Sequence, residues 1–365
     1  MVFDDKKSSR TTSLAGLDTM NERVNLFGLT VKELGEFFLS IGEKPFRAKQ
    51  IYQWLYQRRA DSFGEMTDFS KSLRERLSKN AKIETPQLIK KQESDEAEEF
   101  STNKFLFKLA DGQKIESVYI PDGERRTVCI SSQVGCAVDC KFCATGWMGF
   151  RRNLTVGEIV GQLTYVQKHV DAEITNVVFM GMGEPFLNYD NVIAAAEIIS
   201  APTGCNISKR HVTISTSGIV PRIYDFAESG HSYHIAISLN ATTDKVRQQI
   251  MPITRKYSLK DLLEAARHLN STRRSPVTLE YVLLAEINDS DEDAKRLKKI
   301  SDDLGKCKVN VIPYNPIEGP DLQRPSEARI ERFMKLVSAI HNPLTLRRSR
   351  GRDILAACGQ LAVTD

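Results

Sequence analysis

Two kinds of apolar pattern divide the chain. Between residues 26 and 82, apolar side chains recur at helical spacing, as at Leu34, Phe37 and Phe38, with Gly and Pro residues as breaks. From residue 127 onward, short β-branched runs alternate with helical stretches. The expected strands are 128–130, 176–180, 211–214, 234–237, 277–282 and 308–312, and the expected helices between them are 156–168, 192–199, 219–228, 259–269 and 294–304. This alternation predicts a small helical module followed by a parallel α/β sheet, open or curled into a partial barrel, whose site lies at the carboxyl ends of the strands.

The segments around these two regions have patterns of their own. Residues 1–20 are polar and show no period, so we expect a tail with no assigned role. Residues 93–99 carry a run of acidic side chains, which predicts a loop tip because clustered like charge resists packing. Alternating residues at 104–109 and 115–120 flank Asp111-Gly112, which predicts a β-hairpin leading into the main domain.

Composition and charge narrow the class of protein. The 365 residues are 41% hydrophobic and 27% charged, which is typical of a globular chain and excludes collagen-like and largely disordered classes. No apolar run approaches the roughly 18 residues that cross a bilayer, and the first residues lack the apolar segment of a signal peptide. We therefore expect no membrane insertion and a cytoplasmic location.

The net charge of +4 is too small to indicate a polyanionic partner by itself, but the charge is unevenly distributed. Residues 44–59 contain several basic side chains and no acidic one. This stretch is either a solvated helix face or a surface that contacts phosphates.

The cysteines indicate chemistry rather than a disulfide framework, since they number seven and three of them are crowded together. Cys136, Cys140 and Cys143 form a C-x3-C-x2-C cluster just after the first expected strand of the sheet. Three close thiolates bind a soft metal. A structural zinc would need a fourth ligand, and no second Cys or His pair follows at finger spacing. The spacing therefore favours an iron-sulfur cluster over zinc; Cys205 and Cys307 are expected to be structural, and no mononuclear metal site is expected.

Four stretches together carry a resemblance to a known family. They are residues 136–146, 153–155, 181–185 and 353–361. The cluster motif resembles the radical S-adenosylmethionine (SAM) superfamily, and the full set resembles its RlmN family of dual-specificity RNA adenine-C2 methyltransferases, from about residue 22 to the end of the chain. The resemblance implies a partial (β/α)6 barrel with a small β-hairpin extension and a helix-hairpin-helix-like RNA-binding module. The domains would be a tail at 1–20, the module at 21–103, the barrel at 104–352 and a C-terminal segment at 353–365.

The resemblance also implies a set of cofactor contacts. Cys136, Cys140 and Cys143 would hold one 4Fe-4S cluster, whose open iron chelates SAM. The SAM pocket would be lined by Gly183, Glu184, Ser215, Ser238, Leu239, Asn240 and Asn315. Taken singly, each of these is more typical of a turn or a cap than of a ligand. The glycines at 181–183 do not complete a dinucleotide fingerprint, because Phe186 stands where the third glycine belongs.

Three further residues would act on the substrate if the resemblance holds. Cys358 would be methylated by a first SAM, and the radical from a second SAM would take hydrogen from that methyl group, so two SAM are used per turnover. The methylene radical would then add to the adenine, and Cys129 would resolve the adduct through a transient disulfide with Cys358. Glu116 would accept the proton. From pattern alone, Cys129 is typical of a core, Cys358 of an incidental thiol and Glu116 of an exposed strand position.

The implied substrates are an adenosine in the peptidyl-transferase centre of 23S rRNA and the adenosine 3′ to the anticodon of tRNA. Arginines on both sides of the cluster motif and of Cys358 are expected to hold the RNA backbone while the base flips out: Arg125, Arg126, Arg151, Arg152, Arg347, Arg348, Arg350 and Arg352. We expect a monomer served by an electron donor such as a flavodoxin system. The alternatives are a related adenine-C8 methyltransferase of antibiotic resistance and, more remotely, a zinc-containing RNA-binding protein.

Overall fold

The computed structural model describes residues 23–97, 100–338 and 341–363. The expected tail at 1–20 lies outside the described residues, as do the last two positions of the acidic run at 93–99. Among the helices in these ranges, none has the length and apolar character to cross a membrane.

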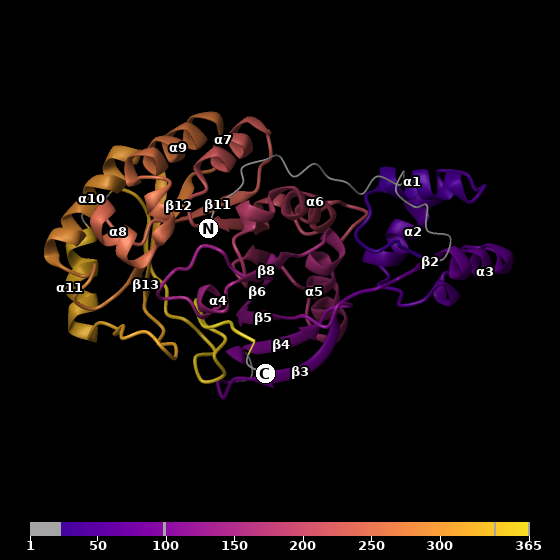
Figure 1. Cartoon of the computed structure of the whole chain (residues 1–365), viewed down its shortest axis with the longest axis horizontal. Helices are drawn as coiled ribbons and strands as arrows, with labels where there is room; N and C mark the ends of the chain where they lie inside the picture. Colours follow the sequence, from indigo (N-terminus) through magenta and orange to yellow (C-terminus); the bar gives the residue numbers. More distant parts are fainter. Residues whose placement is uncertain (1–22, 98–99, 339–340, 364–365) are drawn as a thin grey trace.

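The predicted helical module is present at one end of the molecule (Figure 1). Its elements are β1 (Val24–Asn25), α1 (Val31–Ser40), α2 (Arg47–Tyr56), α3 (Lys71–Asn80) and β2 (Ala81–Lys82), with a 3-10 turn at Phe63–Glu65. The Thr30 hydroxyl caps α1 in a reciprocal box with Glu33, which satisfies two backbone groups at the start of the helix. Because β1 pairs in parallel with β2, the module begins and ends at the same place.

The module packs closely against the helix α5 (Val156–His169) of the main domain. Gly28 has a φ of +96° and approaches so near that a Cβ there would lie 2.4 Å from the backbone N of Gly157. A Cβ on Gly157 would in turn lie 2.6 Å from the Phe27 carbonyl oxygen. Both positions therefore require glycine, one for its conformation and both for space.

The main domain is built on one sheet with the strand order β14-β13-β12-β11-β10-β9-β6-β5-β4-β3. The strands are β3 (Gln87–Glu93), β4 (Asn103–Lys108), β5 (Lys114–Asp122), β6 (Arg125–Cys129), β9 (Asn176–Phe179), β10 (Val212–Thr216), β11 (His234–Ser238), β12 (Val277–Leu283), β13 (Cys307–Pro313) and β14 (Leu344–Leu346). Neighbours from β6 to β14 are parallel, whereas β3 to β6 are antiparallel. The α/β class, the six expected strands and the hairpin are confirmed.

Two edge strands were not expected from the sequence. β14 is short and lies in an Arg-rich stretch, so its apolar signal is weak. β3 has only two half-buried residues among seven, because it covers one edge of the sheet and leaves most side chains in solvent. The expected domain boundary at 103 therefore falls after a strand that already belongs to the main sheet.

The helices between the parallel strands follow one another along the sheet (Figure 1). They are α5, α6 (Tyr189–Ser200), α7 (Val220–Glu228), α8 (Asp244–Ile250), α9 (Leu259–Thr272), α10 (Asp291–Leu304) and α11 (Glu327–Val337), with 3-10 turns at Pro185–Asn188, Lys209–His211 and Pro252–Arg255. Each of the expected helices is present. A short hairpin of β7 (Gln133–Gly135) and β8 (Phe150–Asn153), with α4 (Ala144–Trp147) between its strands, projects from the carboxyl edge.

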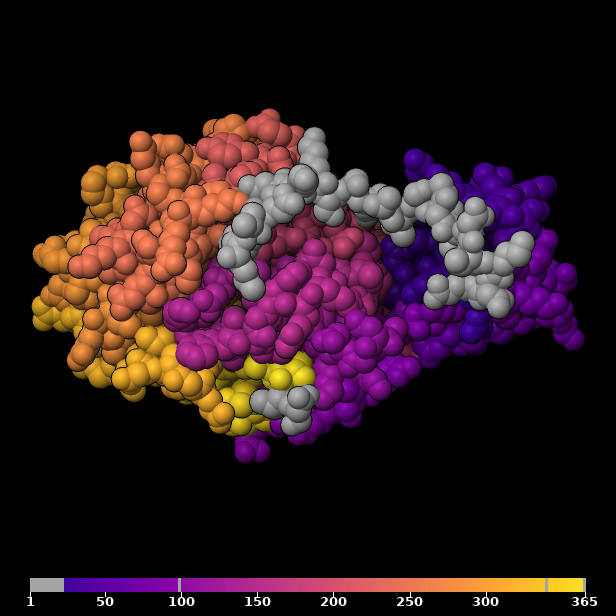
Figure 2. Space-filling model, viewed as in Figure 1, coloured from indigo at the N-terminus to yellow at the C-terminus, as the bar shows by residue number. Residues whose placement is uncertain are grey.

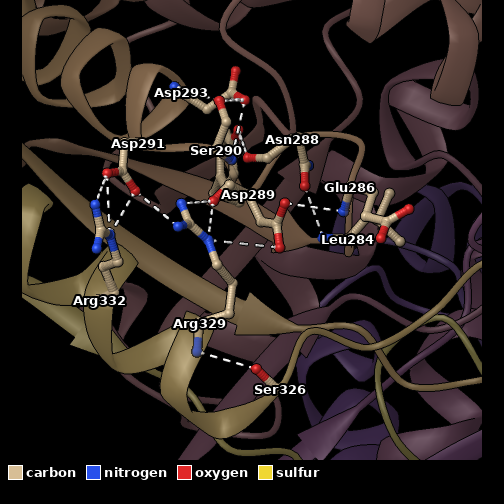
Figure 3. Close-up of polar contacts among 11 residues, drawn as sticks. Leu284, Glu286, Asn288, Asp289, Ser290, Asp291, Asp293, Ser326, Arg329 and Arg332 are labelled. Atoms are coloured by element: carbon tan, nitrogen blue, oxygen red, sulfur yellow. Dashed lines mark hydrogen bonds and ion pairs between the residues drawn. The ribbon is translucent and has the colours of Figure 1, made fainter.

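A polar network ties the start of α10 to α11 (Figure 3). Asp291 accepts hydrogen bonds from Arg329 and Arg332 on α11, and Arg329 also donates to the backbone carbonyl of Asp289. In the same turn Asn288 is fully buried. Its amide donates to the carbonyl oxygens of Asn240 and Val282, at 2.7 Å each. The network therefore also supports the loop after β11, which reaches the carboxyl edge of the sheet.

Candidate active site

A cavity opens at the carboxyl edge of the parallel strands. Its empty space is about 960 Å³ including the open mouth. Loops after β9, β10, β11 and β13 contribute to it, together with the loop before α4 and the C-terminal segment. Among the lining residues are Cys136, Cys140, Cys143, Gly183, Glu184, Ser215, Ser238, Asn240, Glu280, Asn315, Arg347 and Cys358. The site thus lies at the edge that the parallel topology predicts.

The three clustered cysteines stand on the loop that the β7–β8 hairpin closes. The Cys136 N–H donates to the Gly149 carbonyl, and Lys141 N–H donates to the Ile250 carbonyl at 2.9 Å, so the loop is attached at both ends. Burial raises the pKa of all three thiols, because it disfavours the charged thiolate. A bound cation would reverse that preference by compensating the negative charge. Among the described residues, no three His, Cys, Asp or Glu are gathered closely enough to hold a single metal ion.

Polar atoms without partners also face this cavity. Glu280 Oε2 and Asn315 Oδ1 are buried and make no hydrogen bond within the described residues. Ser217 Oγ is a third such atom in the lining. Because buried polar atoms normally have a partner, these three indicate groups kept for a ligand. The three thiols are suitable ligands for a metal cluster, and the partnerless polar atoms beside them are suitable acceptors for a polar cosubstrate such as SAM.

Six of the seven residues expected to contact SAM line this cavity. Gly183 has a φ of +99°, and a Cβ there would lie 2.5 Å from the Gln133 side chain. Leu239 is the exception: it is fully buried outside the lining, and its carbonyl accepts a hydrogen bond from Arg247 at 3.0 Å. Asn240 also has a positive φ, of 56°, and its side chain accepts a hydrogen bond from Val282 N–H at 2.8 Å.

The Glu184 carboxylate is already engaged by backbone groups. Its two oxygens accept hydrogen bonds from Phe186 N–H at 2.9 Å and Ser217 N–H at 2.7 Å. Burial raises its pKa, while these hydrogen bonds lower it. Glu184 therefore joins the loops after β9 and β10 as well as lining the cavity.

A buried guanidinium behind the cavity was not anticipated. Arg247 on α8 is completely buried, and it donates to the carbonyl oxygens of Leu239, Ser217 and Ser238 at 2.6–3.1 Å. Burial lowers the pKa of Arg247 to about 10, which leaves the group charged at neutral pH. This one side chain thus holds together the carboxyl ends of β10 and β11. An arginine in a short polar helix is usually solvated, so the sequence carried no signal for it.

Cys358 and Cys129 come to the same place from opposite ends of the domain. Cys358 is exposed at the mouth of the cavity, where its carbonyl accepts a hydrogen bond from the Asn315 amide. Cys129 is buried at the end of β6. Burial, with the nearby Cys358 thiol, raises the pKa of Cys129 to about 12, and Arg347 acts in the opposite direction. The two thiols are thus electrostatic neighbours, and Arg347 is near both.

Glu116 is buried rather than exposed, and it does not line the cavity. It lies on β5 and forms an ion pair with Lys104 on β4, with 3.1 Å between Oε1 and Nζ. Its other oxygen accepts a hydrogen bond from Ala362 N–H at 3.1 Å. Glu116 is therefore placed against the C-terminal segment that carries Cys358.

Comparison with known proteins assigns the chain to a family. Residues 24–83 match the family described as the ribosomal RNA large subunit methyltransferase N-terminal domain, and residues 130–297 match the radical SAM superfamily. The dual-specificity RNA methyltransferase RlmN of Geobacter sulfurreducens is 47% identical over 348 residues, which cover 94% of this chain and 93% of that protein. Its counterpart in Geotalea uraniireducens is 46% identical over 342 residues, covering 93% and 97%. This chain belongs to the RlmN family.

The RlmN assignment agrees with the structure as well. A radical SAM methyltransferase from Sphaerobacter thermophilus superposes with a TM-score of 0.88 and 40% identity, covering 93% of this chain and 99% of that one. The predicted radical SAM fold is thereby confirmed, and so is the prediction of a radical SAM RNA methyltransferase. Membership implies that the enzyme uses SAM and a 4Fe-4S cluster. The N-terminal family region at 24–83 coincides with the module from β1 to β2.

Half of the arginines expected to hold RNA in this RlmN chain are engaged with acidic partners. Arg152 pairs with Glu158 and Asp111, and the other pairs are Arg347 with Glu280, Arg348 with Glu327 and Arg350 with Asp122. In the module, Arg58 stacks on Trp54, with 4.0 Å from its guanidinium carbon to the ring centre, and pairs with Asp68. Lys44 and Lys49 are exposed beside Phe46, which is 54% exposed. These two lysines are thus better placed to meet phosphates than Arg58.

Proposed function

We propose that this RlmN-family enzyme methylates C2 of an adenosine in the peptidyl-transferase centre of 23S rRNA and of the adenosine 3′ to the anticodon in tRNA. The observation that carries the proposal is that three clustered thiols and Cys358 line one cavity, while Cys129 is buried near enough for the Cys358 thiol to raise its pKa. A nucleophilic methyltransferase would need neither the thiol cluster nor a second cysteine. The number, burial and grouping of the thiols support a radical reaction with a covalent protein intermediate.

Cys136, Cys140 and Cys143 are proposed to hold the cluster, with SAM beside them. When bound, the cluster supplies the electron for reductive cleavage of SAM to the 5′-deoxyadenosyl radical. The SAM site would be shaped by Gly183, Glu184, Ser215, Ser238, Asn240 and Asn315. Leu239 would hold the chain between Ser238 and Asn240 through its backbone hydrogen bonds to Arg247 and Glu280. The free Oδ1 of Asn315 and Oε2 of Glu280 are suitable acceptors for the ammonium of the cosubstrate.

Cys358 and Cys129 would have different roles in methyl transfer. Cys358 would carry the methyl group from the first SAM and, after loss of one hydrogen, join it to the adenine carbon. Attack of the Cys129 thiolate on the Cys358 sulfur would then form a disulfide and break the bond between that sulfur and the methylene group, which leaves with the bonding electron pair and takes up a proton to become the methyl group. The Cys358 thiol raises the pKa of Cys129, which supports a short distance between the two sulfur atoms. Two SAM would be consumed for each methyl group delivered.

Glu116 is proposed as the proton acceptor. Burial raises the pKa of Glu116 while Lys104 lowers it, and a carboxylate whose pKa lies above its usual value is a better proton acceptor. Both of its oxygens are engaged in the described structure, so a shift of the C-terminal segment would be needed before substrate could reach it.

The proposed reaction requires two partners, an RNA substrate and an electron donor. The module would bind RNA through its exposed lysines, and a flavodoxin-like donor would deliver the electron. We further propose that the enzyme acts as a monomer in the cytoplasm.

One experiment tests both the reaction and its position. The anaerobically reconstituted enzyme is given SAM, a reductant and either rRNA or tRNA, and nucleoside mass spectrometry separates 2-methyl- from 8-methyladenosine. We expect 2-methyladenosine in both RNAs. 8-Methyladenosine would support the adenine-C8 alternative, while a colourless, iron-free protein that binds RNA without reaction would support a zinc-containing RNA-binding protein.

A further inference from the structure

A buried ion pair lies outside the cavity, in the antiparallel part of the sheet. Lys104 and Glu116 project from neighbouring strands on the same face, and their side chains are only 8% and 6% exposed. Lysine is rarely buried, because its ammonium group is strongly hydrated. Well-packed apolar residues often replace a buried ion pair without loss of stability. A reason other than stability is therefore expected for this pair.

Both members of the pair reach the segment that carries Cys358, one on each side of it. Lys104 Nζ donates to the Leu355 carbonyl at 3.4 Å, and Glu116 Oε2 accepts from Ala362 N–H at 3.1 Å. Leu355 has a positive φ of 54°, so the chain turns sharply at this contact. An ammonium group can serve a carboxylate and a carbonyl at once because it has three donors. No apolar side chain could make these two contacts.

The opposite side of the segment is held by the cavity wall. Gly359 and Leu361 accept hydrogen bonds from the Ala144 backbone and the Thr145 hydroxyl, at 2.7 and 2.6 Å. The Cys358 carbonyl accepts a hydrogen bond from the Asn315 amide on the same side. Figure 2 shows the segment, in yellow, lying between the magenta and the purple parts of the surface. The ion pair is thus the support on the sheet side, and the cluster loop is the support on the cavity side.

We propose that Lys104 is a positioning residue for methyl transfer: with Glu116 it fixes residues 355–362 so that Cys358 stays at the mouth of the cavity. The proposal rests on the proposed role of Cys358 as the methyl carrier. It assigns Lys104 no contact with SAM or with RNA. Its effect is on the fraction of time that Cys358 spends in reach of the methyl donor and of the adenine.

Amide hydrogen exchange of the full-length reconstituted enzyme tests the proposal without relying on turnover. In Lys104→Met we expect exchange in residues 353–363 to accelerate about tenfold or more, while exchange in β9 to β13 is unchanged. Lys104→Arg should restore most of the protection, because its guanidinium can pair with Glu116. Lys108→Met is the matched control, since Lys108 is an exposed residue on the same strand. Unchanged exchange in Lys104→Met would overturn the proposal.

A second readout separates positioning from a general loss of structure. In Lys104→Met, Cys358 should be alkylated faster by iodoacetamide and methylated more slowly by SAM, with SAM affinity unchanged. If the single variant fails to fold because Glu116 is left unpaired, Lys104→Met/Glu116→Gln keeps the site neutral. Its exchange should then be fast in residues 353–363 alone, and protection equal to the wild type would refute the positioning role. If Cys358 of the wild-type enzyme never acquires a methyl group, the proposed function is wrong. The exchange experiment then still shows whether Lys104 and Glu116 hold residues 355–362 in place.

Discussion

The two halves of the sheet serve the site in different ways. In the parallel half, the strands β9 to β13 all end at one edge, and residues at or just after those ends line the cavity. In the antiparallel half, successive strands point in opposite directions, so no edge collects their ends. No residue of β3, β4 or β5 lines the described cavity. This half instead presents a face, and through Lys104 and Glu116 that face holds the C-terminal segment in place.

The difference shows how parallel strands gather reactive groups at a point, while antiparallel strands offer an extended surface for support. β6 belongs to both halves, since it pairs antiparallel with β5 and parallel with β9. Cys129 is the last residue of this strand, and the Cys358 thiol raises its pKa. Substitutions at the cavity of the parallel half should therefore abolish RNA methylation. Substitutions elsewhere should change the attachment of the C-terminal segment or the affinity for RNA.

The largest effect is expected from Cys140→Ala. Loss of one of three thiolates should remove most of the bound iron and all RNA methylation. The fold should persist, because the sheet core does not depend on a loop at its edge. Iron content, thermal melting and product formation check this, and Cys205→Ala, which removes a buried thiol outside the cavity, should retain iron. Full activity with retained iron in Cys140→Ala would contradict the assigned cluster site.

Substitution of the two extra cysteines should stop the reaction at different stages. Cys358→Ala should abolish RNA methylation while reductive cleavage of SAM continues, because other residues hold the cofactors. Cys129→Ala should still methylate Cys358 and add to the base, and then stall as a covalent protein–RNA species. Denaturing gels before and after RNase digestion, with mass analysis of the peptide containing Cys358, detect it. Free methylated RNA without adduct from Cys129→Ala would refute the two-cysteine mechanism.

Arg247→Met should weaken both stability and SAM binding. It leaves the buried carbonyl oxygens of Leu239 and Ser217, and the partly buried one of Ser238, without this donor; at about 1–3 kcal/mol for each buried unsatisfied group, we expect at least about 2 kcal/mol of destabilisation. Urea unfolding measures this, and calorimetry measures SAM affinity. Arg255→Met, at an exposed position on the following 3-10 turn, is the control and should be neutral. A change below about 0.5 kcal/mol in Arg247→Met would be typical of a surface residue and would contradict the buried role.

The smallest effect is expected in the module. Lys44→Glu/Lys49→Glu should lower RNA affinity and make the dependence of log affinity on log salt shallower, by about 0.7–0.9 for each phosphate that the protein no longer neutralises. The rate of the chemical step at saturating RNA should be unchanged. Lys260→Glu/Lys299→Glu makes the same charge change on exposed positions of α9 and α10 and serves as the control. An identical salt slope in both double variants would indicate that residues 44–49 are a solvated helix face.

The sequence allowed the parallel half to be predicted more fully than the antiparallel half. In β9 the apolar residues Val177 to Phe179 form an unbroken buried run, and in β13 buried apolar residues recur despite Lys308 and Asn310, so both strands are visible in one dimension. β3 escaped notice because its side chains are mostly in solvent and its pairing depends on β4. The burial of Lys104 and Arg247 was not predicted for a similar reason, since a charged residue indicates exposure unless its partners are known.

The sequence by itself determined the alternation of strands and helices, the edge of the sheet where the site would lie, and the thiol motif whose resemblance indicated the chemistry. These depend on local spacing and on the direction of consecutive strands. Only the tertiary structure decided that the Cys358 thiol lies near enough to Cys129 to raise its pKa, that Arg247 joins two strand ends and that Lys104 and Glu116 contact the C-terminal segment. Those contacts join residues up to 251 positions apart, and burial, which gives them their effect, is a property of the folded chain alone.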